Sequence, residues 1–162
     1  MSYQFTCDKC NGISCEYGNV ETMKKAYTTH LSVCNASFFE HVIDFHKKFD
    51  LLALPEPGFL EPDVTEFRIG FMQEELNEFA VAIECSDLEM AADALVDLTY
   101  VVLGTAYLMG IPFKDCWDEV HKANMKKVRA PSAEHSKRNH QCDVIKPENW
   151  VPPDLSKFLK GK

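Results

Sequence analysis

The stretches Glu74-Glu75-Leu76-Asn77-Glu78 and Asp93-Ala94-Leu95-Val96-Asp97 decide how this chain folds, because both carry carboxylates inside helical patterns of apolar residues. At about 100° per residue, Glu75 and Glu78 fall within the apolar arc of the first helix, and Glu74 lies at its edge. The two aspartates of the second stretch lie one turn apart on one face. The pattern therefore predicts two neighbouring helices that carry acids on faces expected to be buried.

Buried carboxylates need compensation. An acid in an apolar interior persists there only if it is protonated, matched by Lys or Arg, or bound to a metal ion. Salt bridges or a solvated helix face are the alternative, but four acids on two buried faces favour a metal. Ligand sets made only of carboxylate oxygens suit Mg²⁺ or Mn²⁺ better than zinc. The predicted ligands are Glu75, Glu78, Asp93 and Asp97.

The hydrophobic period predicts four main helices joined by short links, with a Pro-rich loop at 54–62. Asp63 with Glu66, and Ser86 with Glu89, have the spacing of capping boxes at the starts of the second and third helices. No strand pattern is evident in the body, so we expect an all-α bundle. The expected helices cover about 37–50, 63–84, 86–109 and 113–128.

The same periodicity predicts which faces are buried. On the second helix, Phe67, Leu76 and Ile83 fall in the apolar arc. The third helix is expected to be buried nearly all round. On the fourth, Trp117 shares an apolar stripe with Asn124, so the stripe carries one polar residue.

Composition narrows the class of protein. The 162 residues, 46% hydrophobic and 26% charged, predict one ordinary domain with a small appendage. The longest apolar run, 90–111, is interrupted by two aspartates, so we expect neither a signal peptide nor a membrane span. Seven cysteines, an odd number, suit a reducing, cytoplasmic compartment. A net charge of −8 argues against nucleic-acid binding, although not against a magnesium-chelated nucleotide.

The first 35 residues differ from the body and hold four of the seven cysteines. A Cys pair followed by a His/Cys pair one helical turn apart has the layout of a structural zinc site, with Cys15 as a substitute ligand. Free thiols in a flexible segment are the alternative. Three acids balance three lysines here, so the module lacks the charge for nucleic acid. The predicted zinc ligands are Cys7, Cys10, His30 and Cys34.

These observations divide the chain into three parts. We expect a zinc-finger-like module at 1–35, a helical domain at 36–130 and a wrapped, irregular tail at 131–162.

Two further segments accompany the acidic stretches: residues 119–127, Glu-Val-His-Lys-Ala-Asn-Met-Lys-Lys, and the tail 145–155, from Ile-Lys to Pro-Pro-Asp-Leu. In this combination the chain resembles the MazG-like, all-α nucleoside triphosphate pyrophosphohydrolases. That superfamily also holds phosphoribosyl-ATP pyrophosphohydrolase. The resemblance covers about residues 38–155, and the run 93–104 together with these two segments is similar to one phage and bacterial subgroup.

The resemblance implies Mg²⁺-dependent hydrolysis of a nucleoside triphosphate between the α and β phosphorus atoms, giving the monophosphate and pyrophosphate. Metal ligation would come from Glu75, Glu78 and Asp97, and Glu74 would orient or deprotonate water or reach a second ion. Better-known members carry Glu-x-x-Asp in the second motif, where this chain has Ala94. Asp93 either replaces that acid, on the same helical face, or is a bystander.

The resemblance also implies the substrate contacts and the assembly. Asn124, Lys127 and Lys146 would contact the phosphates, and His46 would line the base or sugar pocket. A homodimer or homotetramer is implied, with sites near subunit contacts. Two other functions stay open: a non-catalytic zinc-finger adaptor on a degenerate body, which Ala94 favours, and phosphoribosyl-ATP hydrolysis. The preferred base and sugar depend on pocket shape, which these residues do not reveal.

Overall fold

The computed structural model describes residues 2–6, 16–34 and 38–160, the side chains of 29–34 excepted. Within these ranges the fold is all-α, as predicted, with six α-helices, one 3₁₀ turn and two two-residue strands. The chain divides into two compact units, Met1–Lys48 and Phe49–Lys162, and each is described by itself.

The first unit contains α1 (Val20–Cys34) and α2 (Phe38–Lys48). Asn19 caps α1, because its Oδ1 accepts hydrogen bonds from the backbone N–H and the hydroxyl of Thr22, each at 2.8 Å. Two ligands of the predicted zinc site lie outside the described residues, and so do the side chains of the other two. The zinc site therefore stays a prediction for Cys7, Cys10, His30 and Cys34.

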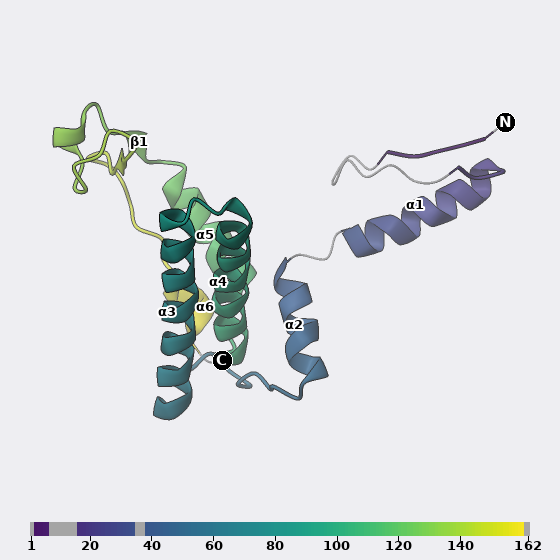
Figure 1. Cartoon of the computed structure of the whole chain (residues 1–162), viewed down its shortest axis with the longest axis horizontal. Coiled ribbons are helices and arrows are strands. Elements are labelled where there is room, and N and C mark those ends of the chain that lie inside the picture. The colour runs from purple at the N-terminus through teal and green to yellow at the C-terminus, as the bar shows by residue number, and fades with distance from the viewer. Residues whose placement is uncertain (1, 7–15, 35–37, 161–162) are drawn as a thin grey trace. The chain divides into compact units, whose positions relative to one another are not determined.

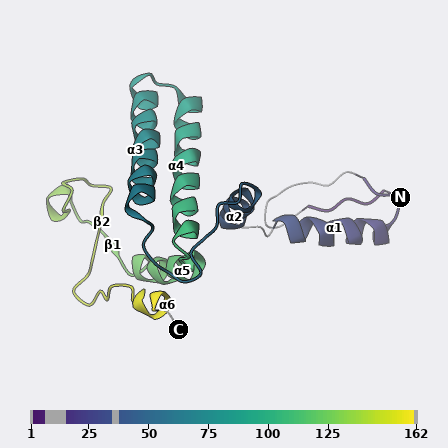
Figure 2. The same cartoon turned by 90° about the horizontal axis from the view of Figure 1, so that it is seen from below.

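The second unit is built on an antiparallel hairpin of α3 (Pro62–Glu84) and α4 (Leu88–Leu108), which lie side by side in both views (Figure 1, Figure 2). The buried and half-buried positions on each helix alternate three and four residues apart, as at a coiled-coil seam. The residues that follow this spacing are Thr65, Arg68, Met72, Glu75, Phe79 and Ala82 on α3, and Ala91, Ala94, Leu98, Val101, Thr105 and Leu108 on α4. Leu103, Gly104 and Ala106 of α4 are buried as well, beside this seam.

Both capping-box predictions are wrong. Helix α3 begins at Pro62, whose fixed φ suits a first helical position, and no side chain caps it. Helix α4 is capped by Asp87, whose carboxylate accepts hydrogen bonds from the backbone N–H groups of Glu89 and Met90, both at 3.0 Å. Ser86 instead has φ 55° and reverses the chain between the helices.

The expected burial of the apolar arc is also wrong for the single chain. Phe67 is 62% exposed, Ile83 59% and, on α4, Val96 62%. The reason is geometric: two helices bury only the narrow seam between them, so apolar residues that flank the seam remain on the surface.

Helix α5 (Phe113–Asn124) follows the hairpin and buries Cys116 and Ala123. Trp117 and Asn124 are exposed, so the predicted stripe is wrong and the buried face lies to one side of it. The helix also ends earlier than expected. Residues 128–129 instead form strand β1 (Val128–Arg129), which pairs antiparallel with β2 (Val144–Ile145).

The tail returns to α5. The Trp150 Nε1–H donates a hydrogen bond to the Ala123 carbonyl at 2.8 Å. From the short α6 (Ser156–Leu159), Lys157 Nζ forms an ion pair with Glu119 on α5 at 2.9 Å. These contacts hold the part of the tail from Trp150 to Lys157 against the same helix.

Helix α4 is long and apolar enough to cross a membrane by length and composition alone. In this fold it packs along α3 and contributes half of the hairpin seam.

Candidate active site

Glu75 is the acid that the fold buries. It occupies a seam position of α3 and is 7% exposed. Its Oε2 atom has no hydrogen-bond partner within the described part of the chain. Because a buried carboxylate oxygen without a partner is costly, this atom has the character of an unfilled ligand position.

The other acids surround Glu75 electrostatically. Burial raises the pKa of the Glu75 carboxyl, and the negative charges of its neighbours raise it further. In decreasing order these neighbours are Glu78, Asp97, Glu74 and Asp93. The two predicted motifs therefore come together around one carboxylate.

Within the described part of the chain, no ion pair joins a basic side chain to these acids. The pairs Lys114–Asp118, Arg138–Asp143 and Lys157–Glu119 lie elsewhere. Arg68 lies two turns before Glu75 on the same face, but it donates to the Val101 carbonyl at 2.7 Å and to the Thr105 hydroxyl at 2.9 Å. The salt-bridge alternative is therefore not supported by the described residues.

The prediction that all the acids are buried is wrong. Glu74, Glu78, Asp93 and Asp97 are exposed in the single chain, because they flank the seam instead of occupying it. Ala94 takes the seam position and is 2% exposed.

Two open hollows lie along the hairpin beside these acids. One, of about 610 Å³, is lined by Glu74 and Glu78, and the other, of about 510 Å³, by Asp93. Met90 lines both. Glu74, Glu78 and Asp93 thus line two hollows that share Met90, and Asp97 lines neither of them.

The donor set suits a hard divalent cation. All five groups are carboxylates, and one of them holds a buried oxygen without a partner. As the side chains stand, no three His, Cys, Asp or Glu residues of the described ranges converge into a metal-binding cage. Carboxylate oxygens, one of them buried and without a partner, are the donors that Mg²⁺ or Mn²⁺ would need, so the chemistry of the residues fits either ion.

The predicted phosphate ligands form a second group. The Nζ atoms of Lys127 and Lys146 lie 6.0 and 4.2 Å from the centre of the Trp150 ring. Asn124 is exposed at the last residue of α5, and its carbonyl accepts the Lys127 backbone N–H at 3.0 Å. The structure therefore brings the two lysines together, without a hydrogen bond or ion pair to the acids within the described ranges.

His46 lies on α2, in the first unit, and is 3% exposed. Its Nδ1 is 2.7 Å from the Val42 carbonyl. A carbonyl only accepts, so Nδ1 carries the proton and donates. This bond fixes the ring orientation, and the role of His46 in a base or sugar pocket stays a prediction.

The sequence profile of the phosphoribosyl-ATP pyrophosphohydrolase family matches residues 42–124, which is about half of the chain and includes both acidic motifs. The chain belongs to the phosphoribosyl-ATP pyrophosphohydrolase family. The membership confirms the resemblance to the MazG-like superfamily and indicates pyrophosphohydrolase activity on a nucleotide. No curated protein matches the chain.

Two residues near the site, Trp150 and Arg68, are not among the predicted site residues. Lys127, Lys146 and Trp150 lie beyond the matched residues. Trp150 was assigned only to the tail, and its link to Ala123 has no sequence signal, because the contact depends on how the tail folds back. Arg68 does have a signal in the sequence. It precedes Glu75 by one heptad, which is two helical turns, and this spacing places both residues in the seam.

Proposed function

We propose that this protein hydrolyses a nucleoside or deoxynucleoside triphosphate to the monophosphate and pyrophosphate in the presence of Mg²⁺ or Mn²⁺. The observation that carries the proposal is the buried, partnerless Oε2 of Glu75, surrounded by four further acids and by no basic partner within the described part of the chain. Family membership supports pyrophosphohydrolase chemistry.

Four acids would hold the metal. Glu75 would contribute the buried ligand, and Glu78 and Asp97 would turn toward it, because their charges act on Glu75 most strongly. Asp93 would complete the set in place of an acid at Ala94. When bound, the ion would offset negative charge on the phosphate oxygens in the transition state.

The reaction needs water to attack the α phosphorus atom. A bond forms from the water oxygen to that atom, and the bond from it to the bridging oxygen breaks, so that pyrophosphate leaves. Glu74 is exposed beside Glu75 and would accept the water proton. Asn124, Lys127 and Lys146 would bind phosphate oxygens.

A substrate panel tests the proposal. Purified protein is incubated with each NTP and dNTP and Mg²⁺, and released pyrophosphate is measured. We expect activity that EDTA removes and that the variants Glu75→Gln and Asp97→Asn lose by at least about 100-fold, the scale of a lost transition-state charge contact. Glu84→Gln, at the end of α3, is the matched control and should retain activity. Unchanged activity in the first two variants would remove the assignment.

Phosphoribosyl-ATP is a second candidate substrate, because the family whose profile matches is described by hydrolysis of that compound. The panel therefore includes phosphoribosyl-ATP, with phosphoribosyl-AMP as the product to detect. Release of pyrophosphate from this compound alone would select this candidate over the general triphosphate reaction.

Oligomerisation is also part of the proposal. Large apolar side chains are exposed along both helices of the hairpin, on both sides of its seam. Exposed apolar surface of this kind marks a protein interface, and a second copy of the chain would cover it. The exposed residues of α3 and α4 include Phe67, Ile69, Leu76, Val81, Ile83, Leu88, Leu95, Val96 and Val102.

A further inference from the structure

The two strands end one residue short of two lysines, Lys127 before β1 and Lys146 after β2. In the ladder of β1 and β2, Val128 pairs with Ile145 and Arg129 with Val144. Continued by one residue, the same register sets Lys127 opposite Lys146. Like charges at opposed positions repel and destabilise the pairing. The position is therefore unfavourable unless something compensates for both charges.

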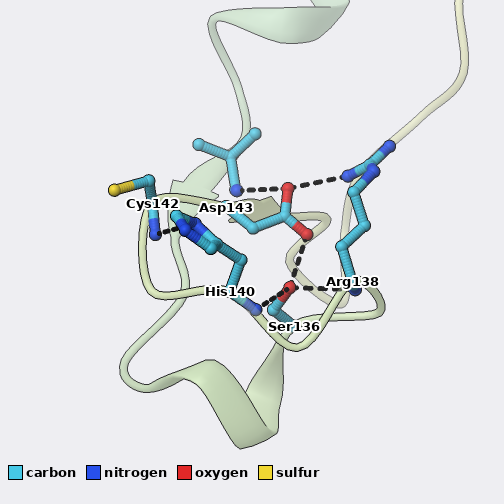
Figure 3. Close-up of polar contacts among 6 residues, drawn as sticks. Ser136, Arg138, His140, Cys142 and Asp143 are labelled. Atoms are coloured by element: carbon cyan, nitrogen blue, oxygen red, sulfur yellow. Dashed lines mark hydrogen bonds and ion pairs between the residues drawn. The ribbon is translucent and has the colours of Figure 1, made fainter. Parts of the chain in front are cut away.

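The register cannot slip to separate the lysines, because a turn fixes it. Asp143 accepts hydrogen bonds from the Ser136 hydroxyl at 2.6 Å, from Arg138 Nη1 at 2.7 Å and from the Val144 N–H at 2.9 Å (Figure 3). The Ala130 N–H donates to the Asp143 carbonyl at 3.0 Å and extends the ladder. These bonds close the loop between the strands at one length.

The Trp150 ring lies beside both ammonium groups. The backbone N–H of Trp150 donates to the Pro147 carbonyl at 2.9 Å. This turn folds the Trp150 ring back toward Lys146. The indole N–H is bonded to Ala123 at the end of α5, so the ring is held in position. At 4.2 and 6.0 Å from one ring centre, the two Nζ atoms lie within roughly one Debye length of each other, ~10 Å at 0.1 M salt.

Among the residues that the structure describes, no acid forms an ion pair with Lys127 or Lys146; the pairs Lys114–Asp118, Arg138–Asp143 and Lys157–Glu119 leave both out. A π-face attracts a cation but carries no net charge, so Trp150 orients the ammonium groups without neutralising them. Two opposed and oriented cations without a counter-charge form a receptor for an anion with several charged oxygens.

We infer that Trp150 is a positioning residue that holds Lys127 and Lys146 as a pair for the diphosphate portion of the substrate, the portion that leaves as pyrophosphate. The inference rests on the proposed function and adds Trp150 to it. The lysines bind the phosphate oxygens, and Trp150 acts through them by fixing where the two ammonium groups lie.

Tryptophan fluorescence tests the pairing without turnover. The chain has two tryptophans, so in Trp117→Phe the only emission comes from Trp150. Inorganic pyrophosphate is titrated in EDTA, which keeps metal at the acidic motifs out of the measurement. We expect a saturable change in emission whose Kd rises about 10-fold when Lys146→Met is added and further with Lys127→Met, and that weakens with salt. A Kd unchanged by both lysine substitutions would overturn the inference.

Kinetics separate positioning from a structural role. We expect Trp150→Leu to raise KM for the triphosphate about 10-fold while kcat stays within about 2-fold, as for lost ground-state binding. Trp150→Phe keeps a ring face and should recover much of the affinity, although it lacks the indole donor. Trp117→Leu, on the exposed face of α5, is the matched control and should leave KM unchanged.

The outcomes distinguish the two proposals. Wild-type KM in Trp150→Leu, in protein that hydrolyses nucleotide, would overturn the role of Trp150 alone. Wild-type protein that hydrolyses no nucleotide would overturn the proposed function, and the pyrophosphate titration would then decide the lysine pair independently.

Discussion

Glu75 is placed where its charge destabilises the metal-free fold. Burial and four negative neighbours raise its pKa, so the ionised carboxylate is unfavourable at neutral pH. In EDTA, we expect Glu75→Gln to unfold at the same temperature as the wild type or higher, because the amide removes the repulsion. In Mn²⁺ the order should reverse, since only the wild type gains binding energy, about 2.7 kcal/mol at one hundred times Kd. Thermal melts of both proteins, with Glu84→Gln as control, measure this. A loss of stability for Glu75→Gln in EDTA would show that the carboxylate is structural.

A second single-residue prediction concerns the backbone at Gly110. Its φ is +65°, and a Cβ there would lie 2.8 Å from the Leu54 carbonyl oxygen. The N–H of Leu54 also bonds to the Leu108 carbonyl at 2.9 Å, so the backbone cannot easily move aside. We expect Gly110→Ala to destabilise the fold by about 1–3 kcal/mol, measured by urea unfolding. Gly70→Ala is the control, because nothing lies within 4 Å of a Cβ at that position.

The Asp143 carboxylate makes the free energy of unfolding depend on pH in the acid range. Hydrogen bonds from Ser136, above all, and then from the Val144 N–H, together with Arg138, lower the pKa of its carboxyl. A lowered folded-state pKa means that the carboxylate stabilises the fold above the unfolded pKa, about 3.9, and that this contribution is lost as pH falls through the lower value. The difference in unfolding free energy between wild type and Asp143→Asn should therefore be constant above about pH 5 and shrink below pH 4. A difference that is independent of pH would contradict the role of the charge.

The sequence predicts which acids lie together, but not which of them is buried or how the two lysines are arranged. The acids of both motifs were predicted together, and they do surround Glu75, because helical periodicity fixes their relative directions. Periodicity did not reveal that only Glu75 enters the seam. The apolar arc of α3 is wider than the strip that one neighbouring helix covers, so the arc alone does not show which of its residues that helix buries. The pairing of Lys127 with Lys146 depends on a strand register that two-residue strands do not encode in their pattern.

At the scale of elements, the α3–α4 hairpin depends on small residues at its closed end. Ala82 is fully buried and Ala91 is 5% exposed, so the helix backbones approach closely there. We expect Ala82→Leu to destabilise the hairpin by about 1–3 kcal/mol through overpacking, as measured by denaturant unfolding. Ala80→Leu, at an exposed position of the same helix, is the matched control and should change little. Equal effects of the two variants would contradict the seam.

The helices themselves were predicted well because their hydrophobic period is long and regular. Their ends were predicted less well. The N-cap position of α3 is Glu61, two residues before the Asp63 that the capping-box pattern favoured, and that of α4 is Asp87, one residue after Ser86. Several residues near each start can cap, and the turn conformation at Ser86 decides between them. The end of α5 was missed because Val128 continues a helical period but pairs with Ile145 in the tail.

For the whole molecule, the exposed flank of the hairpin is the feature that a single chain leaves unexplained. Leu95 and Val96 are 47% and 62% exposed, on the helix that also carries Asp93. Burying such a face against a second copy removes apolar area from water, at roughly 25 cal/mol per Å² before the costs of association. Assembly would thus also determine how enclosed the acids are.

We therefore predict that the wild-type protein is a homodimer or homotetramer by light scattering, and that Leu95→Lys with Val96→Lys shifts it toward the monomer. Val151→Lys is the control, because Val151 is as exposed as Val96 but lies in the tail, away from the hairpin. The monomeric variant should also lose nucleotide hydrolysis, since its acids stay open to water and a metal ion there would be less well held. A variant that becomes monomeric and stays fully active would show that one chain completes the site, whereas a monomeric wild type would leave the apolar flank to another kind of partner.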